Sequence, residues 1–204
     1  MKTKPMSNSS ALYRPAPGRF MLSGALVLLA AFALLSSPRA HAADAAESCK
    51  PPICRLFQAP DAFLSEVFNG AVPAPQVLSL DAAAQSRISA VFGRPFPQSR
   101  VRYWTQDGRT AWIFDDLGKK GYQPTTSGFV VRDGGQVDVA RVLIYKESRG
   151  EQIGDAPFLA QLAGAKANGT GLDVAVDNIS GATLSVQMMV RMARTAIELN
   201  ALVP

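Results

Sequence analysis

The sequence predicts an α+β fold in which antiparallel β-hairpins pack against helices. Asp107-Gly108 lies between two runs of alternating apolar and polar residues, and this dipeptide is a strong signal for a two-residue hairpin turn. Asp133-Gly134-Gly135 separates a second pair of such runs. Helical periodicity over residues 182–199 places a helix near the end of the chain. Two hairpins and a C-terminal helix are therefore the expected frame of the fold.

Both hairpins place apolar side chains on one face of the sheet. The turn at Asp107-Gly108 sets Tyr103 opposite Trp112, an aromatic cross-strand pair that stabilises antiparallel strands. We expect these rings to lie in the sheet core rather than in a ligand site. The three-residue turn of the second hairpin sets two further pairs opposite each other, Val131 with Val137 and Phe129 with Val139. The expected strands cover residues 101–106, 109–115, 127–132 and 136–145.

Helices are expected on both sides of the hairpins in the sequence. Asp81 is the predicted N-cap of a helix over residues 82–92, which Gly93 ends. Shorter elements are a helix over 61–68, a helix over 156–162 and a strand over 172–176. The C-terminal helix has one apolar face, formed by Leu184, Met188, Met192, Thr195 and Leu199, whereas Arg191, Arg194 and Glu198 point elsewhere. We expect its methionines to fill the core.

The N-terminal segment 1–42 has the organisation of an export signal. Basic residues precede an apolar run over 20–35, and Ala40-His41-Ala42 resembles a cleavage site. The segment is therefore either a cleaved signal peptide or an N-terminal membrane anchor. Residues 43–98 are expected to form an extension with two short helices, and residues 99–204 the main domain.

Removal of residues 1–42 changes both the charge and the available chemistry. Five of the 21 basic residues leave with this segment and none of the 16 acidic residues does, so the remainder has no net charge. A nucleic-acid-binding face would need a basic surplus that is missing. His41 is the single histidine, so the remainder also lacks the usual general base and metal ligand. Cys49 and Cys54 are read as a structural disulfide formed in an oxidising compartment.

The segment Asp177-Asn178-Ile179-Ser180-Gly181-Ala182-Thr183 is the strongest candidate for a functional site. Small residues here lead directly into a helix, whose first backbone N–H groups are unpaired and suit a phosphate. Thr183 lies in the first turn, where its hydroxyl can reach the same anion. The alternative is an ordinary helix start, with Ser180 as N-cap and nothing bound.

The string D-x-x-S-G-A-T in this segment closely resembles the flavinylation motif of the FMN-binding domain family. That family includes flavin-carrying components of the Rnf electron-transport complex and of the sodium-pumping NADH:quinone reductase. In it, a flavin transferase links FMN through its phosphate to the last threonine of the motif. The resemblance implies FMN on Thr183, with Asp177, Ser180, Gly181 and Ala182 as the other matching positions.

A second segment, Glu147-Ser148-Arg149-Gly150, is similar to the family's E-T-P-G-x-G loop, which follows a β-hairpin and lines the flavin pocket. Ser148 replaces the threonine, Arg149 replaces the proline, and two extra residues separate the glycines. This pattern is similar to that of small stand-alone or membrane-anchored members. The resemblance implies flavin contacts from Glu147 to Gly150, and the alternative is a solvated charged loop.

These observations lead to a functional expectation. The chain is expected to be an exported flavoprotein electron carrier, periplasmic or anchored in the inner membrane, that exchanges electrons with membrane or periplasmic redox proteins. A flavin transferase would be its maturation partner. No G-x-G-x-x-G follows a strand, so no nicotinamide site is expected, and a redox subunit is favoured over a stand-alone catalyst. The alternatives are a module that binds FMN or another small ligand non-covalently, and a cofactor-free structural subunit of an envelope complex.

Overall fold

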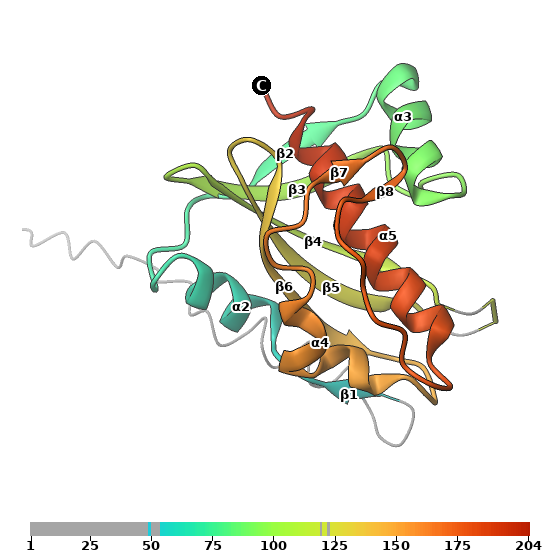
Figure 1. The fold of residues 1–204 in the computed structure, drawn as a ribbon. Coiled ribbons are helices and arrows are strands. Elements are labelled where there is room, and N and C mark those ends of the chain that lie inside the picture. Colours follow the sequence, from blue (N-terminus) through green and yellow to red (C-terminus); the bar gives the residue numbers. More distant parts are fainter. Residues whose placement is uncertain (1–48, 50–53, 119, 122) are drawn as a thin grey trace, which may run out of the picture. The chain divides into compact units, whose positions relative to one another are not determined.

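The computed structural model describes residue 49 and residues 54–118, 120–121 and 123–204 (Figure 1). Its centre is a six-stranded antiparallel sheet with the strand order β1-β6-β5-β4-β3-β2. The strands are β1 (Arg55–Leu56), β2 (Gln76–Ser79), β3 (Arg100–Gln106), β4 (Arg109–Asp116), β5 (Thr125–Arg132) and β6 (Gln136–Tyr145). The predicted α+β class and the C-terminal helix are confirmed.

Helices lie against both faces of this sheet. They are α2 (Pro60–Val67), α3 (Ala82–Phe92), the 3-10 helix η1 (Glu151–Gly154), α4 (Ala156–Ala160) and α5 (Thr183–Asn200). Figure 1 shows α5 crossing the sheet, with α3 beside it. A small second sheet pairs β7 (Ala167–Asn168) with β8 (Gly171–Leu172). Within the described part of the chain, no helix is both long and apolar enough to cross a membrane.

The predicted register is right for the first hairpin and partly wrong for the second. Tyr103 pairs with Trp112, and their stacked rings have centroids 5.1 Å apart. Val131 pairs with Val137 as predicted, but Phe129 pairs with Ala140 and not with Val139. The register shifts between Val130 and Val131, as a β-bulge does when it inserts one extra residue on one strand.

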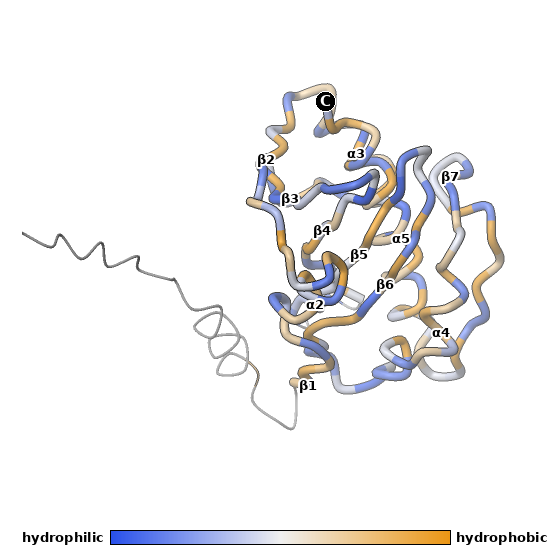
Figure 2. Tube along the Cα trace, turned by 90° about the vertical axis from the view of Figure 1, so that its left-hand side faces the viewer, coloured by the Kyte–Doolittle hydropathy of each residue, from blue (hydrophilic) through white to orange (hydrophobic). Residues whose placement is uncertain are grey.

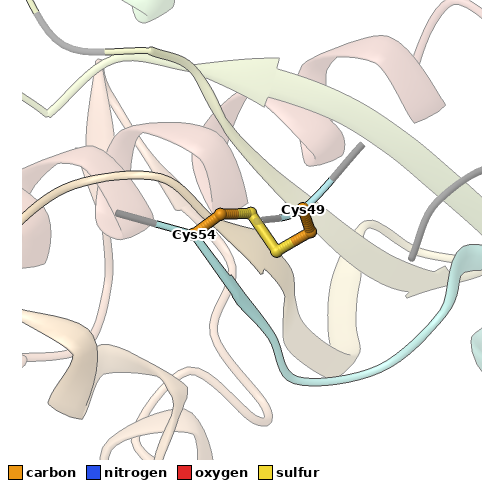
Figure 3. Close-up of a disulfide and its surroundings, with 2 residues drawn as sticks. All are labelled: Cys49 and Cys54. Atoms are coloured by element: carbon orange, nitrogen blue, oxygen red, sulfur yellow. A yellow bond between two sulfur atoms is a disulfide. The ribbon is translucent and has the colours of Figure 1, made fainter. Parts of the chain in front are cut away.

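The segment before residue 99 contributes both edge strands of the sheet. β1 pairs with the end of β6, and β2 pairs with β3 along all four of its residues. The sequence predicted only the two helices of this segment. Cys49 and Cys54 form a disulfide directly before β1, with their Cα atoms 5.0 Å apart (Figure 3). The segment 1–42, for which a signal or anchor is predicted, lies outside the described residues.

Two layers of apolar side chains enclose the sheet, and hydrophobic stretches follow its central strands (Figure 2). The larger layer lies under α3, α4 and α5 and includes Trp112, Phe129, Met188 and Met192, which are fully buried. The smaller layer lies under α2. Burial of the α5 methionines confirms that they fill the core.

The last part of the chain differs from its prediction in several places. Leu184 is 47% exposed, although it was assigned to the apolar face of α5. Arg194 was expected outside but is only 7% exposed, because its Nε donates to the Gly169 carbonyl oxygen and it pairs with Glu198 at 2.8 Å. Of the strand expected over 172–176, only Leu172 lies in a strand, β8. Helix α4 ends at Ala160 rather than at residue 162.

A buried carboxylate joins β4 to α5 and to the residues directly after α3. Asp116 is 2% exposed, and its carboxylate forms ion pairs with Arg94 and Arg191. The carboxylate also accepts a hydrogen bond from the Leu117 N–H. Burial raises the pKa of Asp116 above its ordinary value, although both arginines favour the charged carboxylate. The residue therefore fixes α5 to the sheet while remaining costly to ionise.

Asp116→Asn tests this balance. Because the pKa of Asp116 is raised in the folded state, its contribution to stability is full in acid and declines as the pH rises through the folded pKa, above 3.8. The free energy of unfolding of the native chain, relative to that of Asp116→Asn, should therefore decrease between about pH 3.8 and neutrality. Urea denaturation of both proteins across this range measures the difference. An increase with pH would mean that the arginines outweigh burial.

Candidate cofactor site

The two segments singled out in the sequence lie on opposite sides of one cavity of about 540 Å³. One wall is the loop after β6, and the other is the start of α5. The lining residues are Glu147, Ser148, Arg149, Gly181, Ala182, Thr183, Leu184 and Ser185. More than 30 positions of sequence separate the two walls, so the fold alone brings them together.

The start of α5 forms one wall without a side-chain cap. The N-cap residue is Ala182, which has no side chain able to accept the first backbone N–H groups, and Gly181 precedes it with φ of +79°. Ser180 is therefore not the N-cap, and the alternative of an ordinary Ser180-capped helix is wrong. An uncapped helix N-terminus presents unpaired N–H groups and a partial positive charge, which together favour a phosphate.

Thr183 is the first residue of α5 and lines the cavity with an exposed side chain. Its Oγ1 accepts a hydrogen bond from Asn178 Nδ2 at 3.0 Å. The hydroxyl is thus accessible from solvent and also held in one orientation. This combination suits a group that has to react with a large incoming molecule.

Glu147 occupies the opposite wall in a fixed position. Its side chain is 9% exposed, and Oε1 accepts the Gly118 N–H at 2.8 Å. A Cβ at position 118 would lie only 2.6 Å from Oε1, so a side chain there would displace the Glu147 carboxylate from this position. The residues after β4 therefore orient Glu147.

A buried junction connects the two walls. The Tyr145 hydroxyl donates to the Arg149 carbonyl oxygen and lies 3.2 Å from Ser185 Oγ. Gly150 has φ of +94°, and a Cβ there would collide with Ser185 Oγ. Gly150 does not line the cavity itself, but it allows the loop after β6 to pack directly on the first turn of α5.

Asp177 and Ser180 lie beside the cavity, not in it. Both are exposed, and the Asp177 backbone N–H donates to Gln161 Oε1 at 2.7 Å. Ser148 and Arg149 both line the cavity, where Arg149 is exposed. Arg149 forms no ion pair with any described residue, so its charge is available to an anion.

Sequence reasoning missed the residues that support the site from outside the two motifs. Tyr145 and Gly118 gave no local signal, because their roles depend on neighbours far away in the chain. Ser185 lies two positions after Thr183, and residues two apart on a helix do not face each other, so its contact with Tyr145 had no local signal either. Among the described residues, no group of three or more acidic, histidine or cysteine side chains could hold a metal ion.

The uncapped helix N-terminus, the exposed Thr183 hydroxyl and the facing Arg149, which has no ion pair with any described residue, together suit a phosphate-bearing ligand. The cavity volume also falls within the range of about 300–1,000 Å³ typical of small-molecule sites. The family model of the FMN-binding domain matches residues 121–198. The matched residues include every residue that lines the cavity, and the match indicates FMN as the cofactor. No curated protein and no solved structure matches the chain.

Gly150→Ala tests the junction between the walls. The added methyl group cannot fit beside Ser185, so the loop after β6 should move away from α5 and the FMN content per chain should fall several-fold. Gly134→Ala is the matched control, because Gly134 has φ of +86° but no atom within 4 Å of the added Cβ. Both variants carry a similar backbone strain of about 1 kcal/mol. Flavin absorbance after protein quantification measures the content, and equal content in the two variants would contradict the assigned role.

Proposed function

We propose that this protein is an exported electron carrier in which FMN is joined to Thr183 through a phosphoester. The observation that carries the proposal is the exposed Thr183 hydroxyl at the uncapped N-terminus of α5, inside a cavity of the FMN-binding domain. The match between D-x-x-S-G-A-T and the family's flavinylation motif supports the same assignment.

The residues around the cavity have separate tasks in this proposal. The first N–H groups of α5 bind the phosphate and orient it, and Arg149 adds a positive charge from the facing loop. The Glu147 carboxylate, fixed by Gly118, offers an acceptor for an N–H group of the cofactor. Bound FMN supplies the redox chemistry, because it takes up and returns one or two electrons without help from a histidine or a metal.

Export is supported by two features of the chain. The first 42 residues have the organisation of a secretory signal, and the Cys49–Cys54 disulfide is typical of an oxidising compartment. We therefore propose a periplasmic location, either free or anchored in the inner membrane through the N-terminus. The redox partners would be membrane or periplasmic proteins, and a flavin transferase would load the cofactor.

Two alternatives were open from the sequence. The match to the FMN-binding domain supports a flavin-binding protein over a cofactor-free structural subunit. Non-covalent FMN binding remains as the second candidate, because the uncapped helix N-terminus suits a free phosphate as well as an esterified one. The two candidates differ in whether flavin remains on the chain after unfolding.

Thr183→Ala separates these candidates. The protein is co-expressed with a flavin transferase in a host that exports it, and flavin fluorescence is recorded after denaturing electrophoresis together with the intact mass. The native chain should gain the mass of an FMN ester and fluoresce, and Thr183→Ala should do neither. Thr183→Ser keeps the hydroxyl and is the control for correct folding. Flavin that leaves the native chain on denaturation would contradict the phosphoester.

Arg149→Ala tests the environment of the flavin. A positive charge near the reducible ring favours the anionic reduced form, so its removal should lower the midpoint potential. A loss of about 1.4 kcal/mol corresponds to roughly 30 mV for a two-electron couple. Arg149→Lys keeps the charge and should retain most of the native potential. Redox titration measures both, and an unchanged potential in Arg149→Ala would place the arginine away from the ring.

A further inference from the structure

Thr183 lies where two cavities meet. The first holds the helix N-terminus and the Glu147 loop, and the second, of about 580 Å³, is lined largely by aliphatic side chains. Thr183 lines both, whereas Asn178 lines the second. The Asn178 amide therefore reaches Thr183 Oγ1 from the side of the second cavity, and the first cavity remains open to the hydroxyl.

The backbone on both sides of Asn178 is anchored. Before it, the Asp177 N–H donates to Gln161 Oε1 at 2.7 Å. After it, Ile179 packs against the core, and its carbonyl oxygen accepts the Ala182 N–H at 2.9 Å. The amide of Asn178 is thus presented by a fixed loop, and its hydrogen bond to Thr183 closes that loop into a ring of six residues.

We infer that Asn178 is a positioning residue for the attachment of flavin to Thr183, an inference that rests on the proposed phosphoester. Its Nδ2–H occupies one lone pair of Oγ1 and fixes the side-chain rotamer of Thr183. The hydroxyl proton and the remaining lone pair then point away from Asn178, toward the first cavity. Thr183 Oγ1 is therefore oriented for reaction before the flavin donor binds.

The attachment step is a phosphoryl transfer without oxidation or reduction. The co-reactant is a flavin dinucleotide, whose phosphoanhydride joins an FMN half to an AMP half. Thr183 Oγ1 forms a bond to the phosphorus of the FMN half, and the P–O bond to the AMP half breaks. AMP leaves with the electron pair of that bond, and the hydroxyl proton passes to a base of the transferase.

The Asn178 side chain acts as a hydrogen-bond donor both before and after this step. Its N–H group donates to Oγ1 before the reaction and can donate to an anionic phosphate oxygen afterwards. A carboxylate of the same shape would accept a hydrogen bond from the hydroxyl instead and would repel the incoming phosphate. Asn178→Asp therefore reverses the interaction at nearly constant size.

The test measures the rate of flavin attachment to purified apoprotein, with a flavin transferase and flavin adenine dinucleotide, by intact mass. Asn178→Asp should reduce kcat about tenfold, as expected for the loss of one charge-assisted hydrogen bond, while KM for the apoprotein stays near that of the native chain. Asn178→Ala should give a smaller loss, and Asn178→Gln, which restores a donor, a partial recovery. Asn168→Asp places the same charge change on an exposed residue of β7 and should react at the native rate.

Each outcome decides one question. Equal kcat in the native chain and Asn178→Asp would overturn the positioning role of Asn178 and leave the phosphoester intact. A rise in KM alone would also overturn it, because Asn178 would then serve recognition by the transferase. A native chain that gains no mass would instead overturn the proposed function. Thermal unfolding of each variant separates these results from a failure to fold.

Discussion

The contact of Tyr145 with Ser185 is the interaction on which the cofactor site depends. The tyrosine is the last residue of β6, a strand that is paired on both sides in the sheet. Its hydroxyl contacts the Arg149 carbonyl oxygen on one side and Ser185 on the other. Both walls of the cavity are therefore held in place by the sheet. Gly150 makes this close packing possible. The sheet therefore sets how α5 and the loop after β6 face each other across the cavity. A site held in this way is preorganised for its ligand.

Two further contacts restrain the same site from the far end of β4. Asp116 fixes α5 through Arg191, and Gly118, two residues later, fixes Glu147 through its backbone N–H. A single short segment thus controls the helix on one wall and the carboxylate on the other. Movement of Asp116 and Gly118 would therefore change both walls of the cofactor site together.

Local rules predicted the elements that depend on neighbouring residues. Asp81 caps α3 by accepting the Ala84 N–H, and Asp107-Gly108 forms the turn that pairs Tyr103 with Trp112. The features that were missed depend on distant parts of the chain. β1 is only two residues long and exists because the end of β6 is available to pair with it. The bulge at Val130 and the burial of Arg194 also arise from tertiary packing, which no short pattern encodes.

The open side of the cavity gives a physical reason for a covalent attachment. Arg149, Gly181 and Thr183 are all exposed, so water competes for the polar contacts that the phosphate would make. A free FMN phosphate carries a charge of about −1.5 to −2, and a helix N-terminus with one arginine offsets this only in part in a site open to solvent. Outside the cytoplasm, released cofactor would be diluted and lost. In the proposed phosphoester, retention no longer depends on affinity, and the same N–H groups then serve to orient the flavin. A shallow, accessible site then becomes an advantage, because the transferase can reach Thr183 and redox partners can approach the ring.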